Sequence, residues 1–286
     1  MLENKKMSDR LVDAQWLSTH LQDPKVRVIE VDLTGTEAYA AGHIPGALGW
    51  NWKEWLWDPL EREFPTPQEF ARRCGEAGIA NDTTVVFYGE PVPFGTYAWW
   101  VFTYLGHADV RLLDGGRTAW VAKGNPLTTE VPRIVPRSYL PPCAPKLEMR
   151  VGRDEVLRDL PKYRAADSMV LLDHRSPEEF DGRRVNVPGM PDVGAERNGH
   201  IPGARHLYFT EFLNADTSFK PPAELRSLLE ARGADAGKEI VSYCRLSHRA
   251  TLAYFVMHEL LGFKKVRSYD GSWTEWGSMV GMPVER

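Results

Sequence analysis

The chain is poor in cysteine. Its 286 residues include 3 cysteines, Cys74, Cys143 and Cys244, and no two of them form a C-x-x-C pair. An odd number of widely separated cysteines argues against a disulfide framework and against a structural zinc site. No other pattern in the sequence implies a metal or an organic cofactor.

Long apolar runs are also missing. The opening segment 1–6 is charged, and no later stretch is long and apolar enough to span a bilayer, so we expect no secretory signal, no membrane anchor and a cytoplasmic protein. A net charge of −4 with scattered lysines argues against nucleic acid as the main partner. With 43% hydrophobic and 26% charged residues, the composition is typical of an ordinary globular protein, and the length favours two domains.

The two halves of the chain repeat each other. The turn Gly-His-Ile-Pro-Gly at residues 42–46 recurs at residues 199–203. Asp114 and Trp120 recur as Asp270 and Trp276, each 156 positions further along (270 − 114 and 276 − 120). The repeat predicts two domains of similar fold, 1–130 and 149–286, joined by a proline-rich linker at 131–148. Since paired domains can bury each other's apolar faces, we expect a monomer.

Short β-branched runs alternate with amphipathic patterns in both halves. Strands are predicted at equivalent places, 26–31 with 169–172 and 84–88 with 239–243. Such alternation indicates an α/β fold in which helices cover both faces of a parallel sheet. Thr-Pro-Gln-Glu at 66–69 and Ser-Pro-Glu-Glu at 176–179 carry the N-cap, proline and glutamate of helix starts. The helix after Thr66 places Cys74 on its apolar face, and Cys143 falls in the linker, so we expect Cys74 in the core and Cys143 exposed.

Cys244 is in the most informative context. The segment Val-Ser-Tyr-Cys-Arg-Leu-Ser-His-Arg at 241–249 runs from a strand pattern through a basic loop into a helix. A cysteine between a strand end and a helix N-terminus has backbone N–H groups directed at its sulfur, which favours the thiolate. Arg245 and Arg249 act in the same direction, and the loop is expected to attract an anionic substrate.

These features together resemble the two-domain rhodaneses, the thiosulfate sulfurtransferases, and the bacterial branch in particular. The resemblance covers nearly the whole chain and rests on the paired Gly-His-Ile-Pro-Gly turns, on Tyr-Cys-Arg at 243–245 and on the closing Asp-Gly-Ser-Trp-Thr-Glu-Trp at 270–276. It implies two tandem rhodanese-like domains, each with a parallel sheet flanked by helices, of which the second is catalytic. The first copy has Gly89 where the second has Cys244, so we expect its role to be structural.

The resemblance also implies a reaction. The thiolate of Cys244 attacks the outer sulfur of thiosulfate, sulfite leaves, and a persulfide then passes its sulfur to cyanide or to a thiol acceptor by ping-pong kinetics. Arg245 and Arg249 are expected to bind the sulfonate oxygens. His248 either adds positive charge or points to solvent.

Outside the loop, Asp173 and Arg175 resemble the family's Asp-x-Arg segment after the first catalytic-domain strand. They either organise the edge of the substrate site or simply form a local turn and ion pair. Glu179 departs from the vertebrate enzymes, which have a substrate-binding arginine there, and Leu246 replaces a second basic residue. An insertion between Phe180 and Gly199 carries Arg183, Arg184 and Arg197, for which both substrate contact and solvated surface charge are open. His43 and His200 recur in both copies, which favours a structural role.

Three other functions compete. A rhodanese-fold phosphatase needs Cys-x5-Arg, but Arg249 follows Cys244 by five positions, so the loop is one residue too short. 3-Mercaptopyruvate sulfurtransferases typically have small uncharged residues after the cysteine, so the two arginines favour thiosulfate, although Leu246 weakens that preference. A non-catalytic binding or sulfur-relay module is disfavoured by the intact Cys244.

Overall fold

The computed structural model describes residues 8–33 and 36–286. The charged opening segment 1–6, from which we inferred the lack of a secretory signal, therefore lies outside the described residues. The chain divides into two compact units: unit 1 extends to Lys146 and includes Asn214–Phe219, and unit 2 consists of Leu147–Leu213 and Lys220–Arg286. No helix in the described part of the chain is both long and apolar enough to cross a membrane.

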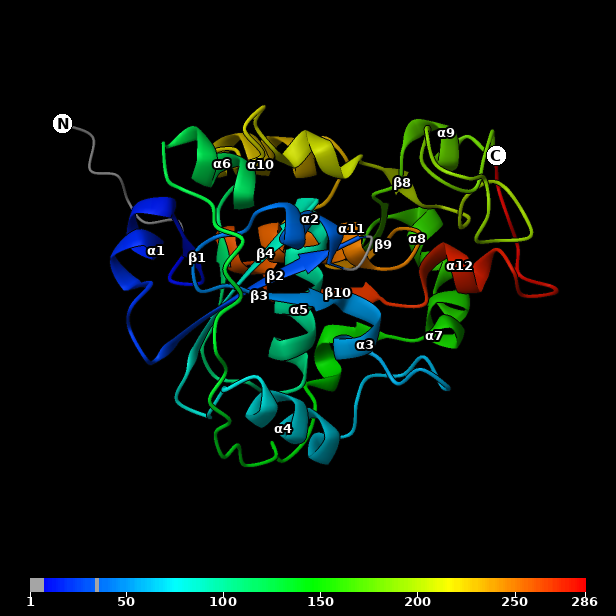
Figure 1. The fold of residues 1–286 in the computed structure, drawn as a ribbon. Helices are drawn as coiled ribbons and strands as arrows, with labels where there is room; N and C mark the ends of the chain where they lie inside the picture. Colours follow the sequence, from blue (N-terminus) through cyan, green and yellow to red (C-terminus); the bar gives the residue numbers. More distant parts are fainter. Residues whose placement is uncertain (1–7, 34–35) are drawn as a thin grey trace. The chain divides into compact units, whose positions relative to one another are not determined.

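Unit 1 contains one sheet of five parallel strands, in the order β1-β5-β4-β2-β3. Figure 1 labels β1, β4, β2 and β3 of this sheet. Its elements, in chain order, are β1 (Leu11–Val12), α1 (Ala14–His20), β2 (Val26–Asp32), α2 (Glu37–Ala41), β3 (Leu48–Asn51), α3 (Trp52–Leu56), α4 (Pro67–Glu76), β4 (Thr84–Glu90), α5 (Val92–Tyr104), β5 (Val110–Leu113) and α6 (Gly116–Ala122).

Unit 2 repeats this topology with the strand order β6-β10-β9-β7-β8, again all parallel. Its elements are η1 (Leu147–Met149), β6 (Arg150–Val151), α7 (Arg153–Arg158), α8 (Leu160–Ala165), β7 (Met169–Asp173), α9 (Pro177–Phe180), β8 (Arg205–His206), η2 (Phe209–Phe212), α10 (Pro222–Glu230), β9 (Glu239–Tyr243), α11 (His248–Phe255), η3 (Val256–Leu260), β10 (Val266–Tyr269) and α12 (Ser272–Trp276). The α/β fold with two tandem copies of one parallel sheet is thus confirmed, and each of the four predicted strands is present.

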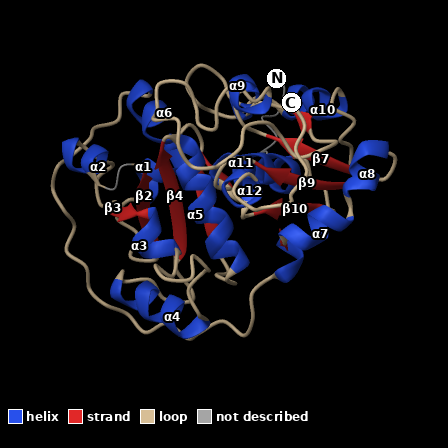
Figure 2. Cartoon of the chain, turned by 90° about the vertical axis from the view of Figure 1, so that its right-hand side faces the viewer, coloured by secondary structure: helices blue, strands red, loops and turns tan. Residues whose placement is uncertain are grey.

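Strands β7 and β9 of unit 2 are buried on both faces of their sheet, to which successive side chains of a strand point in turn. Val241 and Tyr243 of β9 belong to a buried cluster that also includes Tyr163 of α8 and Trp273 and Trp276 of α12. Figure 2 labels these three elements together with the strands β7 and β10. The strand residues between and around them are buried as well. Burial on both faces explains why the sequence of β7 is a continuous apolar run over residues 169–172.

The tryptophans of residues 50–57 pack inside unit 1. The rings of Trp50 and Trp55 stack with centroids 4.2 Å apart, and those of Trp52 and Trp57 meet edge to face at 4.5 Å. The indole N–H of Trp57 donates to the hydroxyl of Tyr97 at 2.6 Å. This aromatic cluster supports the predicted structural character of the first copy, since such pairs add to the free energy of burial.

Both predicted helix starts are confirmed. Thr66 caps α4 by accepting from the backbone N–H of Glu69, and Ser176 and Glu179 form a complete capping box at the start of α9. Cys74 is buried and Cys143 is exposed, as expected.

Candidate active site

Cys244 lies directly after β9, in the loop that leads into α11. Its side chain is buried, with 1% of the residue exposed. The loop closes at Ser247, whose φ of 71° is in the left-handed region and reverses the chain just before His248 begins the helix. The cysteine therefore occupies the carboxyl end of a parallel strand, which is where open α/β sheets place their ligands.

Three hydrogen bonds from the start of α12 hold the backbone of the loop. The N–H of Cys244 donates to Ser272 Oγ at 3.2 Å, and Ser272 Oγ in turn donates to the carbonyl of Tyr269 at 2.8 Å. The N–H groups of Trp273 and Thr274 donate to the carbonyls of Cys244 and Arg245, each at 3.0 Å. These contacts fix the backbone position of Cys244 within the folded protein, which is what preorganisation of a site requires.

Arg249 is engaged by a carboxylate. Its two terminal nitrogens donate to the two carboxylate oxygens of Glu179, at 2.6 and 2.9 Å, and Glu179 is completely buried. Burial lowers the pKa of Arg249, but the charge of Glu179 and its hydrogen bonds together act more strongly in the opposite direction, so the pKa lies above its ordinary value. The anionic form of Cys244 also favours the protonated guanidinium.

Arg245 is held much more loosely. Its Nη2 donates to the carbonyl of Val193 at 3.2 Å, and its Nε has no hydrogen-bond partner among the described residues. Burial, aided by the positive charge of Arg249, lowers the pKa of Arg245 from its ordinary value, and the anionic form of Cys244 opposes that shift. The two arginines that the sequence presented as equivalent thus have different surroundings.

Asp173 and Arg175 form a buried ion pair. Arg175 Nε donates to both carboxylate oxygens of Asp173 at 3.0 Å, and its Nη2 donates to Asp173 at 2.6 Å and to the carbonyl of Gly199 at 2.7 Å. The guanidinium lies 4.5 Å from the ring centroid of Trp273. Burial raises the pKa of Asp173, but Arg175 outweighs it and the pKa falls below its ordinary value. The expected local ion pair is present; a contact with substrate stays a prediction.

His248 is buried, with 7% of the residue exposed, so the alternative in which it points to solvent is wrong. The reason is local: His248 is the first residue of α11, whose residues from His248 to Phe255 are all buried. Positive charge from His248 at the loop stays a prediction.

The insertion between Phe180 and Gly199 borders the loop through Val193, which accepts the hydrogen bond from Arg245. Its arginines do different things. Arg183 pairs with Asp181, and Arg184 donates to the carbonyl of Met190. Arg197 donates to the backbone carbonyls of four residues of the C-terminal segment, Trp276, Gly277, Met279 and Met282.

Sequence reasoning missed three residues of this site. Ser272 was covered only as part of the segment 270–276, and the buried His174 only as the middle residue of the Asp-x-Arg segment, so neither was singled out. Glu179 was noted only as a departure from the vertebrate pattern, and its role in the capping box gave no sign that Arg249, 70 residues later, is its partner. A buried carboxylate needs a cationic partner, but the sequence around Glu179, which includes Glu178, Asp181 and Arg183, gave no sign that this side chain is buried.

Unit 1 has no nucleophile at the equivalent place. Gly89 lies in β4, and a Cβ at this position would overlap the backbone nitrogen of Gly95 and stand 2.7 Å from the carbonyl oxygen of Pro91. The glycine is therefore required by the close approach of α5.

The histidines of the two Gly-His-Ile-Pro-Gly turns have matching contacts. His43 stacks on Tyr39, and His200 stacks on Phe180, with centroids 3.7 and 3.9 Å apart. Each Nδ1 bonds to the backbone carbonyl of its stacking partner. The same arrangement in both copies supports the structural role expected from the sequence.

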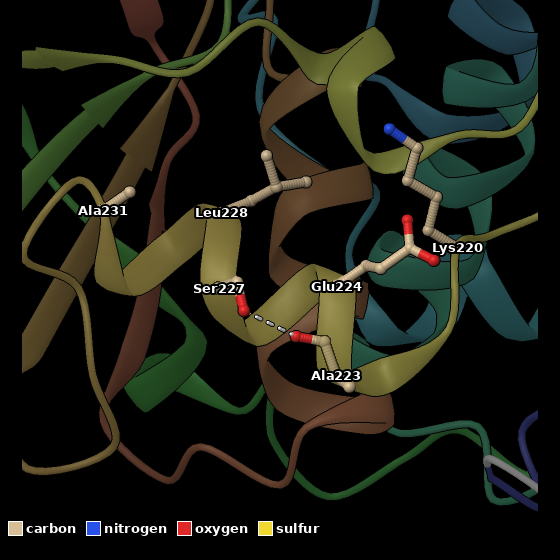
Figure 3. Close-up of a pocket in the computed structure, with 6 residues that line it drawn as sticks. All are labelled: Lys220, Ala223, Glu224, Ser227, Leu228 and Ala231. Atoms are coloured by element: carbon tan, nitrogen blue, oxygen red, sulfur yellow. Dashed lines mark hydrogen bonds between the residues drawn. The ribbon is translucent and has the colours of Figure 1, made fainter.

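A surface hollow on α10 lies apart from these residues. Figure 3 shows its lining, which comes from one short segment: Lys220, Ala223, Glu224, Ser227, Leu228 and Ala231. The hollow has no cysteine, histidine or arginine in its lining, and so offers none of the chemistry found around Cys244.

Comparisons with known proteins agree with this geometry. A family model described as "Rhodanese-like domain" matches residues 13–123 and 155–279. A Thermus thermophilus protein named "Sulfur carrier protein TtuD" is 46% identical over 277 residues, which is 96% of each chain. A Haloferax volcanii protein named "Putative thiosulfate sulfurtransferase" is 41% identical and covers 97% of this chain and 96% of its own, and a Mycolicibacterium smegmatis protein of the same name is 42% identical, covering 97% and 98%.

Solved structures are similar over the same extent. The anaerobic ergothioneine biosynthesis enzyme from Chlorobium limicola, in complex with trimethyl histidine, matches with a TM-score of 0.81 at 26% identity, covering 96% of this chain and 70% of that chain. Because the family model matches both halves and relatives above 40% identity cover almost the entire chain, this protein belongs to the rhodanese family and is a sulfurtransferase by family.

Proposed function

We propose that this protein is a thiosulfate sulfurtransferase that works through a persulfide on Cys244. The observation that carries the proposal is the position of Cys244 between β9 and α11, with its backbone tied to Ser272 and with Arg245 and Arg249 close by. The relatives named "Putative thiosulfate sulfurtransferase" support it.

In the first step, the Cys244 thiolate forms a bond to the outer sulfur of thiosulfate. The sulfur–sulfur bond of thiosulfate breaks, and its electron pair leaves with sulfite. In the second step, a thiol or cyanide attacks the terminal sulfur of the persulfide, and the thiolate of Cys244 is released. The sum converts thiosulfate and the acceptor into sulfite and the sulfurated acceptor, and no redox partner is needed because each step is a displacement at sulfur.

Arg245 supports recognition of the donor, since no carboxylate among the described residues is paired with its guanidinium, and a guanidinium suits the sulfonate oxygens. The backbone N–H groups of the loop and the start of α11 favour the negative charge on sulfur. Asp173 and Arg175 are proposed to act indirectly, because the guanidinium that pairs with Asp173 also lies over the ring of Tyr243 and so holds the ends of β7 and β9 together beside the loop.

A second function, transfer of the sulfur onward to another protein or cellular thiol, is favoured by the relative named "Sulfur carrier protein TtuD". It uses the same persulfide, so it differs from the first in the acceptor and not in the loading step. 3-Mercaptopyruvate as the donor is the remaining alternative.

The experiment that tests the proposal is the intact mass of the reduced protein after brief incubation with thiosulfate or with 3-mercaptopyruvate. We expect one added sulfur atom from thiosulfate, lost again when cyanide is added. Cys244→Ala is expected to gain none, and Cys143→Ala, which removes an exposed thiol, is expected to gain it as the wild type does. If only 3-mercaptopyruvate adds sulfur, the donor is 3-mercaptopyruvate instead of thiosulfate. If the Cys244→Ala variant also gains sulfur, Cys244 is not the nucleophile.

A further inference from the structure

The two arginines of the Cys244 loop differ in what neutralises them. Among the ion pairs of the described residues, Arg249 is paired with a carboxylate and Arg245 is not. Both terminal nitrogens of Arg249 are occupied by Glu179. Because these two nitrogens already donate to a carboxylate, they cannot at the same time form a second bidentate pair with a sulfonate.

Glu179 is itself fixed from the other side. Its Oε2, which accepts from Arg249, also accepts from the backbone N–H of Ser176 at 3.0 Å, and its own N–H donates to Ser176 Oγ at 3.3 Å. The capping box of α9 therefore orients the carboxylate, and full burial leaves it no alternative rotamer in solvent. The short helix α9 thus holds the negatively charged carboxylate of Glu179 in a fixed position against Arg249.

A fixed carboxylate so near the loop works against anions of high charge. Without Glu179 the loop would present two cationic side chains, whereas with it the pair of Arg249 and Glu179 is neutral and only Arg245 keeps its full charge. Interactions between charges are strong at sites of restricted water access, and a dianion feels the loss of one positive charge about twice as strongly as a monoanion does.

We propose that Glu179 is a specificity-determining positioning residue, which acts through Arg249 and sets the preference of the Cys244 loop between dianionic donors such as thiosulfate and monoanionic donors that carry one carboxylate. This inference rests on the proposed function of the loop, and it identifies Arg245 as the cation that meets the donor.

The test measures anion binding without turnover. In a Cys244→Ser background, Kd is measured by calorimetry for thiosulfate and for hydroxypyruvate, the unreactive oxygen analogue of 3-mercaptopyruvate. Adding Glu179→Gln keeps an oxygen that accepts from Ser176 but removes the negative charge. We expect Kd for thiosulfate to fall about tenfold and Kd for hydroxypyruvate to fall less than about threefold, as the loss of one charge from a charge-assisted contact implies.

Glu178→Gln is the matched control. It removes the same charge one residue earlier, on a side chain that is not buried against Arg249, and it is expected to change neither Kd by more than about twofold. Combining Glu179→Gln with Arg249→Gln should remove the gain in thiosulfate affinity, because the gain comes from the released guanidinium.

Equal changes for both anions, or no change, would overturn the role of Glu179. Persistence of the gain after Arg249→Gln would overturn the route through Arg249. Failure of the proposed function would be seen in a different measurement, because the wild-type protein would then acquire no sulfur from either donor. The ratio of the two Kd values would still decide the inference about Glu179.

Discussion

Ser272 Oγ accepts the hydrogen bond of the Cys244 backbone N–H, and the two residues are 28 positions apart in the chain. The contact connects the end of β9 to the turn that follows β10. Because both residues are buried, water cannot replace either partner. The placement of Cys244 therefore depends on the neighbouring strand as well as on its own loop.

Replacing Ser272 with Ala should lower the free energy of unfolding by about 1–3 kcal/mol, because the buried N–H of Cys244 loses its acceptor. It should also slow sulfur loading from thiosulfate. Urea unfolding and time-resolved intact mass measure the two effects. Ser227→Ala is the control: its hydroxyl bonds only to the carbonyl of Ala223 on the exposed side of α10, so a change within about 0.5 kcal/mol is expected (Figure 3). Equal losses in both variants would contradict the special role of Ser272.

Arg249→Gln and Arg245→Gln should differ in stability. The first leaves the carboxylate of Glu179 buried and unpaired, which costs about 3–5 kcal/mol, while the second breaks only one long hydrogen bond to Val193 and should cost about 1 kcal/mol or less. Urea denaturation of the two variants side by side checks this. Comparable losses would mean that the ion pair with Glu179 is not formed in solution.

Gly89→Cys should not create a second active cysteine. The new Cβ would overlap the backbone nitrogen of Gly95, so the variant is expected to lose at least about 1–3 kcal/mol and to stay unmodified by thiosulfate in a Cys244→Ala background. Gly152→Cys, where a Cβ meets nothing within 4 Å, is the steric control and should keep nearly the wild-type melting temperature. Sulfur added to the Gly89→Cys variant in that background would show that unit 1 fails to accept sulfur only because it lacks a cysteine at position 89.

His174 should make unit 2 sensitive to acid. Burial lowers its pKa from 6.5 to about 4, and its ring nitrogens bond to the carbonyl of Leu207 and the hydroxyl of Ser242. The unfolded chain binds the proton more tightly, so the stability due to neutral His174 is complete above about pH 6.5 and is lost as pH falls towards 4, by up to about 3 kcal/mol.

The measurement is the pH dependence of unfolding in wild type and His174→Gln. Comparison with the variant is necessary because burial raises the pKa of Asp32 and of Asp114 in unit 1 to about 6, and these carboxyls act with the opposite sign between about pH 4 and 6. The difference between the two curves should shrink as pH falls from 6.5 to 4. A difference that is constant with pH would exclude His174 as the cause.

Local sequence determined the fold class and the candidate nucleophile. The repeated turns, the β-branched runs and the Thr66 and Ser176 caps are local signals, since each depends on residues within a few positions. Cys244 could be predicted because a strand, a basic loop and a helix start are consecutive in the chain. The lack of a thiol at this place in the first copy also followed from alignment of Gly89 with Cys244.

Partner choice within the site was decided only by the tertiary structure. Glu179 and Arg249 come together because β7 and β9 are neighbours in the sheet, which brings the segments after both strands to one edge. The sequence by itself determined which groups need partners when buried, a carboxylate, two guanidinium groups and a backbone N–H. Which partner each one receives was decided by strand order and burial, because hydrogen bonds and ion pairs act over a few ångströms and residues tens of positions apart reach that distance only in the folded chain.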